Sequence, residues 1–210
     1  NISARRRVAT LDHDTPGGPM SHDWLALYRR AGAGFARRIA VVPDWSAPVV
    51  RGIVTHVLEE QRQVPHLLAG RSPQQALADL EPLRDDLAAE WSLYSFAAAA
   101  AWRSTDRSTV VRVAGDAMPA HEFLREQVAE LAIHTWDLAR VIGADEQLDD
   151  DVVEAVWTVF EPQRSELVAS GVAVPVSDGA PLQDRMLALT GRTASGFSAK
   201  PVCAMAAAAA

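Results

Sequence analysis

Cysteine is almost absent from this chain of 210 residues, which contains Cys203 alone. A single thiol excludes both an intramolecular disulfide framework and a metal site built from several cysteines. Cys203 lies in a late, low-complexity stretch, where a catalytic thiol would be poorly held. We therefore expect that any sulfur chemistry of this protein uses a thiol from outside the chain.

The chain also lacks an excess of positive charge and a long hydrophobic run. It has 20 Lys and Arg against 27 Asp and Glu, a net charge of −7. Nucleic-acid binding needs a basic face, so no nucleic-acid partner is expected. No apolar run approaches the roughly 18 residues of a membrane helix, and no signal-peptide core is visible. These absences predict no membrane partner and a cytoplasmic location.

Helices dominate the fold that the sequence predicts. Hydrophobic residues make up 49% of the chain, and its heavy use of alanine favours close-packed helices over a sheet. The β-branched run at 109–113 predicts an isolated strand or an extended connection. Apolar residues at helical spacing predict helices over about 22–40, 46–70, 72–101, 119–142, 149–168 and 180–189. We expect an all-α protein: a four-helix bundle with additional C-terminal helices and at most a short β connection.

The predicted domain organisation is simple, because the length suits one compact domain. Residues 1–20 lack hydrophobic periodicity and are expected to form a disordered N-terminal extension. A single helical domain is expected over 21–192, followed by a low-complexity tail at 193–210. The sequence leaves an oligomer open.

The segment 130–140 (ELAIHTWDLAR) places Glu130 and His134 four residues apart in a predicted helix. Such a pair lies on one helix face, with Cβ atoms roughly 6 Å apart, close enough to hold one metal ion. His56 lies in another predicted helix, and two facing helices could bring all three side chains together. Two nitrogens and one carboxylate form a common catalytic zinc shell with room for water or substrate.

Simpler interpretations of these residues also stand. A Glu and a His at this spacing are commonly a weak surface pair. Nickel, iron or manganese could occupy the same ligands as zinc. Asp137 could orient a ligand histidine or instead pair with Arg140 on the surface.

Three segments resemble the mycothiol-dependent maleylpyruvate isomerase-like family of the DinB-like metalloenzyme superfamily. The segment 130–143 (ELAIHTWDLARVIG) resembles its Glu-Leu-x-x-His-x-Trp-Asp-Leu-Ala signature, and 50–57 and 174–192 are similar to its first-ligand helix and its closing segment. The resemblance covers about 23–192. It implies a DinB-like bundle that holds a divalent metal, usually zinc, through His56, Glu130 and His134.

Two departures from the family pattern limit what the resemblance transfers. Relatives commonly carry a tryptophan eight residues before the first ligand, where this chain has Pro48, so no specific substrate is carried over. The chain is also expected to be too short for the separate C-terminal domain of the maleylpyruvate isomerases.

The first functional hypothesis is a divalent-metal-dependent enzyme, a transferase or an isomerase. It would use mycothiol or a similar low-molecular-weight thiol, as a metal-bound thiolate, for S-transfer to or isomerisation of a small electrophilic substrate. Asp137 would orient one histidine, and Arg140 would meet an anionic substrate if it faces the pocket. One alternative is a metal-dependent hydrolase, lyase or cyclase that needs no thiol. Another is a non-catalytic helical module that binds a small ligand.

Overall fold

The computed structural model describes residues 22–113, 116–193 and 196–197. They group into two compact units, one of residues 24–152 and one of residues 153–197 together with 22–23. The predicted extension at 1–20, Cys203 and most of the predicted tail at 193–210 lie outside the described residues. The single domain expected over 21–192 stays a prediction.

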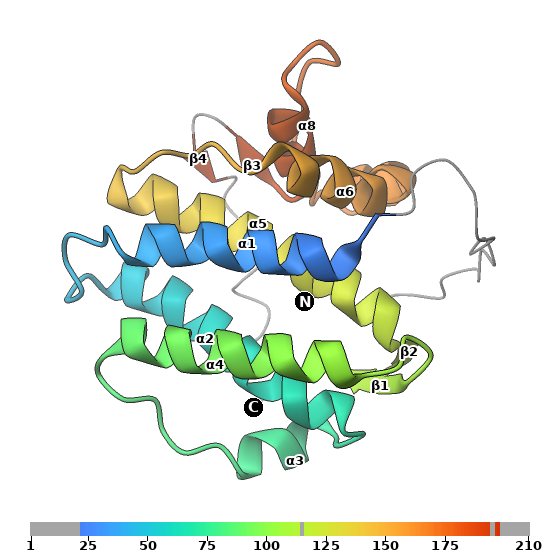
Figure 1. Ribbon diagram of the computed structural model, residues 1–210. Helices are drawn as coiled ribbons and strands as arrows, with labels where there is room; N and C mark the ends of the chain where they lie inside the picture. The colour runs from blue at the N-terminus through green and yellow to red at the C-terminus, as the bar shows by residue number, and fades with distance from the viewer. Residues whose placement is uncertain (1–21, 114–115, 194–195, 198–210) are drawn as a thin grey trace. The chain divides into compact units, whose positions relative to one another are not determined.

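Four long helices form the larger unit (Figure 1). Each packs against two others: α1 against α4 and α5, and α2 against the same two, so that the four close into a bundle. A short helix, α3, packs against α2. The bounds are α1 Trp24–Ile39, α2 Pro48–Leu68, α3 Pro73–Ala78, α4 Leu87–Ser104 and α5 Ala120–Ile142. The predicted all-α class is confirmed.

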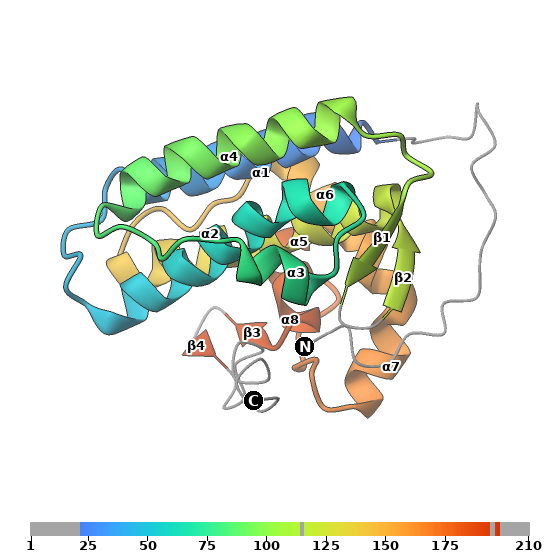
Figure 2. The same ribbon diagram turned by 90° about the horizontal axis from the view of Figure 1, so that it is seen from below.

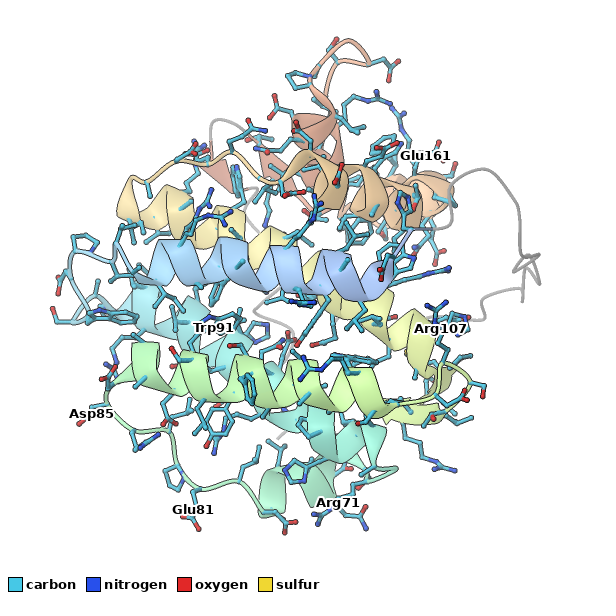
Figure 3. The ribbon with its side chains drawn as sticks, in the orientation of Figure 1. Arg71, Glu81, Asp85, Trp91, Arg107 and Glu161 are labelled. Carbon is cyan, nitrogen blue, oxygen red and sulfur yellow. The ribbon has the colours of Figure 1, made fainter. Side chains whose placement is uncertain are left out.

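The core of the bundle is made by apolar side chains from all four long helices. Phe35 of α1, Leu58 of α2 and Leu138 of α5 have no exposed surface. Trp91 of α4, labelled in Figure 3, packs edge-on against Phe35 with ring centroids 4.8 Å apart. Burial of such side chains contributes roughly 1.5–3 kcal/mol each, which makes this core the main support of the site described below.

α5 is the most deeply buried helix of the bundle. Residues 127–139 are buried without a break apart from Glu130, so the apolar stripe predicted from the sequence extends around most of the helix. The helix ends at Gly143, whose φ of 68° and ψ of 26° lie in the left-handed region. Gly143 suits this position, because a residue without Cβ adopts that conformation at little cost.

The segment predicted at 109–113 as an isolated strand or extended connection does form a strand, and only its isolation is wrong, because it has a partner. Strand β1 (Val110–Val113) pairs antiparallel with β2 (Asp116–Pro119), with Val111 opposite Met118. Figure 2 shows this hairpin leading directly into α5. The sequence of the second strand contains no β-branched residue, so only the ladder of hydrogen bonds reveals it.

The predicted helix over 72–101 is interrupted and forms α3 and α4 instead. Pro82 lies in the break and disfavours helical backbone at the preceding residue. The carbonyl of Glu81 accepts a hydrogen bond from Arg62 of α2, and the Asp86 side chain caps α4 by accepting from the backbone N–H of Ala89 at 3.0 Å. Figure 3 shows Glu81 and Asp85 along this outer connection.

Two further predicted helices differ from those observed, one at its start and one in its middle. α2 begins at Pro48 rather than at the predicted position 46. Its N-cap is Ala47, which makes no side-chain capping bond, and the hydroxyl of Ser46 donates to Asp44 at 2.7 Å. The predicted helix over 149–168 is divided at Pro162. It forms α6 (Asp150–Phe160), the single 3₁₀ turn η2 (Glu161–Gln163) and α7 (Arg164–Ala169).

The smaller unit continues with α8 (Leu182–Leu189), close to the predicted helix at 180–189, and a short pair of strands. These are β3 (Arg192–Thr193) and β4 (Gly196–Phe197). Among the described residues, no helix has the length and apolar character needed to cross a membrane.

Candidate metal centre

One face of α5 carries the carboxylates and the imidazole that the sequence pattern singled out. His134 lies between two acidic side chains, with its Nε2 3.2 Å from Glu130 Oε2 and its Nδ1 3.2 Å from Asp137 Oδ2. The side chains of His134 and Asp137 are only 7% and 5% exposed. Both residues are buried, and α1 and α2 pack against α5.

α2 brings His56 to the same place. The rings of His56 and His134 meet edge to face, with centroids 4.8 Å apart and planes at 72°. One ligand atom each from His56, Glu130 and His134 can be chosen so that all three lie within 4.8 Å of one another. Packing of α2 against α5 thus joins residues that are more than seventy positions apart in the chain.

The three side chains suit a divalent metal in donor chemistry and in spacing. Bonds of about 2.0–2.2 Å in a tetrahedral zinc shell place neighbouring ligand atoms about 3.4 Å apart. The widest pair here, separated by up to 4.8 Å, would have to close by about 1.4 Å. His56 and Glu130 can make that movement, because their side chains are 29% and 27% exposed, whereas His134 is held firmly.

The charge state of His134 reflects its two acidic neighbours. Burial alone would lower its pKa, but the interactions with Asp137 and Glu130 outweigh burial and raise the pKa to about 10. Metal-free His134 is therefore an imidazolium at neutral pH. A metal ion that binds its nitrogen must displace a proton.

Glu60 is a further carboxylate at the site that the sequence reasoning missed. Its Oε1 lies 3.5 Å from His56 Nε2, one helical turn along α2. Burial, followed by the charge of Glu130, raises the pKa of Glu60 to about 8. His56 shows the opposite shift, since burial and then the charge of His134 lower its pKa. The signal was available: His56 and Glu60 have the same spacing of four as Glu130 and His134.

Next to the site, buried amides tie the helices together. The Tyr28 hydroxyl of α1 donates to Gln61 Oε1 of α2, and Gln61 Nε2 donates to Gln127 Oε1 of α5 at 3.2 Å. Gln61 is 1% exposed. Because unmade hydrogen bonds of buried amides are costly, this chain of bonds fixes the register of α2 on α5 and so the approach of His56 to His134.

Arg140 has partners in the larger unit. Its Nη1 lies 2.8 Å from Glu146 Oε2, and its guanidinium carbon lies 5.2 Å from the centre of the Trp136 ring. A role for Arg140 in binding an anionic substrate stays a prediction.

Comparison with known proteins bears on the fold. No protein-family model and no curated protein sequence matches the chain. Solved structures do match. The fold is similar to that of the mycothiol-dependent maleylpyruvate isomerase. That crystal structure aligns with a TM-score of 0.59 over 84% of this chain and 91% of the isomerase chain, at 18% identity.

A mutant of the same isomerase, in which one histidine is replaced by alanine, gives a TM-score of 0.58 at 18% identity, over 83% of this chain and 90% of the mutant. The predicted resemblance and the DinB-like fold are thereby confirmed. The chain was expected to be too short for the separate C-terminal domain of the maleylpyruvate isomerases, but the alignment covers 91% of the isomerase chain. At this identity the likeness establishes the fold, and the chemistry must be argued from the site.

Proposed function

We propose that this protein is a divalent-metal-dependent enzyme that uses mycothiol or a similar small thiol to transfer sulfur to, or isomerise, a small electrophilic substrate. The observation that carries the proposal is the convergence of His56, Glu130 and His134 within 4.8 Å. The similarity of the fold to a mycothiol-dependent isomerase supports the thiol part of it.

The proposed roles follow from the positions of the side chains. His56, Glu130 and His134 hold the metal, with zinc as the first candidate. When bound, a divalent cation keeps a coordinating thiol in its thiolate form at neutral pH. Asp137 faces Nδ1 of His134 at 3.2 Å and so leaves Nε2, on the Glu130 side, as the metal-binding nitrogen.

The reacting sulfur is expected to come from the small thiol, because residues 22–113, 116–193 and 196–197 contain no cysteine. Its thiolate adds to one carbon of an electron-poor carbon–carbon double bond, whose π electron pair moves onto the electron-withdrawing group. If the new carbon–sulfur bond stays, the adduct takes up the proton of the thiol and the thiol has been transferred to the substrate. If the adduct instead rotates about the former double bond and the carbon–sulfur bond breaks, the electron pair restores the double bond, the thiol is regenerated and the substrate is isomerised.

Metal quantification tests the ligand set. We expect about one divalent ion per chain in the wild type, and about tenfold less in His56→Ala and His134→Ala. His66→Ala is the matched control, because His66 also lies in α2 but contacts Arg71 rather than the cluster. Loss of metal in the control, or full retention in both ligand variants, would contradict the assignment.

Thiol dependence is tested separately with metal-loaded protein, mycothiol and maleylpyruvate. Turnover that requires the thiol supports the proposal. A product formed equally well without thiol identifies hydrolase, lyase or cyclase chemistry instead. If the wild type binds no metal and zinc leaves its stability unchanged, the protein is a non-catalytic helical module, because a ligand of the native state must stabilise it.

A further inference from the structure

The smaller unit contains a cavity of about 300 Å³ that shares no residue with the metal centre. It lies among α6, α7, α8 and the loop that joins α7 to α8, a loop that can be followed in Figure 2. Apolar side chains form much of its wall: Val168, Val174, Val176 and Leu189. Val168 and Val176 are 58% and 36% exposed, so the cavity presents apolar surface to whatever enters it.

Arg185 of α8 places its positively charged guanidinium at this wall. Its guanidinium carbon lies 4.5 Å from the centre of the Trp157 ring of α6, in the arrangement of a cation–π contact. Stacking on the indole fixes the guanidinium while leaving its N–H donors unused. Within the part of the chain that the structure describes, no carboxylate pairs with Arg185.

A second arginine lines the same cavity and is more loosely held. Arg164 Nη2 lies 3.2 Å from Asp178 Oδ1, and the two side chains are 45% and 84% exposed. An ion pair this exposed contributes little stability. The charged side chains lining the cavity are therefore two arginines and one aspartate, a local positive balance in a chain with a net charge of −7.

We propose that this cavity binds a small organic monocarboxylate with an apolar body. The carboxylate is received by Arg185, whose planar fork of donors matches a carboxylate with two parallel hydrogen bonds. The apolar body lies against Trp157 and the valines of the wall. The volume is at the lower end for small-molecule sites, which limits the ligand to a single ring or a short chain.

Binding of simple carboxylates to the full-length protein tests the site. The probes are hexanoate, benzoate and phenylacetate, each beside its primary amide, measured by calorimetry and by saturation-transfer NMR at up to about 10 mM. At least one carboxylate is expected to bind saturably, and its amide about tenfold more weakly or less, because the amide lacks the charge.

Variants distinguish carboxylate binding in this cavity from binding at other arginines or at the metal centre. Arg185→Gln is expected to weaken carboxylate binding about tenfold, and Arg185→Lys by less, since it keeps the charge but not the fork. Arg103→Gln, at an exposed arginine of α4, and His134→Ala should leave binding unchanged. Asp178→Asn removes the competing carboxylate and should strengthen binding by up to about fivefold, which also provides a test if Arg185→Gln does not fold.

Three results would overturn the proposal. The first is the absence of saturable binding of any carboxylate to the wild type. The second is equal affinity for a carboxylate and its amide. The third is binding that His134→Ala abolishes while Arg185→Gln retains it, which would assign the carboxylate to the metal centre.

Discussion

Raising the pH from about 6.5 to 8 is expected to strengthen zinc binding by at least about tenfold for each pH unit. The reason is the proton on His134. Its neighbours Asp137 and Glu130 raise its pKa to about 10, so the metal-free site carries this proton throughout the range. Each proton that zinc displaces adds one logarithmic unit of affinity per pH unit, or about 1.4 kcal/mol.

His56 and Glu60 decide how steeply the zinc affinity rises with pH. Burial, followed by the charge of His134, lowers the pKa of His56 below its ordinary value of 6.5, so His56 adds little to the slope. Glu60, with a pKa raised to about 8, adds up to a second proton if bound zinc expels it. Glu60→Gln removes that contribution, so this variant should show a slope close to one, and the wild type a slope between one and two.

Competition of the protein with a chelator of known zinc affinity measures the slope. Calorimetry in two buffers that differ in ionisation enthalpy counts the released protons independently. Asp137→Asn provides the decisive comparison, because it removes the negative charge that lies 3.2 Å from His134 Nδ1. The pKa of His134 then falls and the slope flattens, while affinity at the alkaline end drops about 10- to 100-fold.

Two outcomes would refute this reasoning. One is a wild-type zinc affinity that does not change with pH over the range. The other is an Asp137→Asn variant that keeps the full slope, since the proton would then not depend on the carboxylate that faces the ring.

The metal-free protein should itself lose stability as the pH rises. The folded-state pKa of His134 lies above its ordinary value of 6.5. The contribution of its charged form to the free energy of unfolding is therefore complete below about pH 6.5 and is lost towards pH 10. Urea denaturation at a series of pH values, with chelator present, would measure this loss. Two glycines should respond in opposite directions to replacement by alanine, although an added Cβ meets no atom within 4 Å at either. Gly143→Ala should cost about 1–2 kcal/mol because its φ is +68°, whereas Gly52→Ala, inside α2, should stabilise by about 0.5–1 kcal/mol. Equal shifts in melting temperature for the two variants would contradict this.

Sequence patterns predicted a helix well wherever the apolar spacing ran without interruption and a residue typical of a helix end followed it. The apolar spacing of α1 and α5 and the cap at Gly143 gave bounds within about two residues of those observed. The same patterns failed at Pro82 and Pro162, because apolar residues continued at helical spacing on both sides of each proline. Periodicity measures which residues can share a face, and it does not register a break in the backbone.

The candidate site was predictable only in part. The spacing within 130–137 is a property of one helix, so Glu130, His134 and Asp137 could be grouped from the sequence. Glu60 has the same spacing of four from His56, so the sequence could have grouped it with that histidine. Its nearness to Glu130 and His134, however, becomes visible only when α2 is packed in its observed register.

The sequence by itself determined what each helix presents: a buried stripe, a carboxylate and imidazole one turn apart, and no cysteine within the described residues. These follow from the 3.6-residue period and from composition, which act over a few residues. The tertiary structure alone decided that His56 meets His134, that two carboxylates keep a proton on the buried His134 ring against the opposing effect of burial, and that Arg185 stacks on Trp157 beside a cavity. Those outcomes depend on contacts between distant segments, and such contacts exist only when side chains pack and water is excluded.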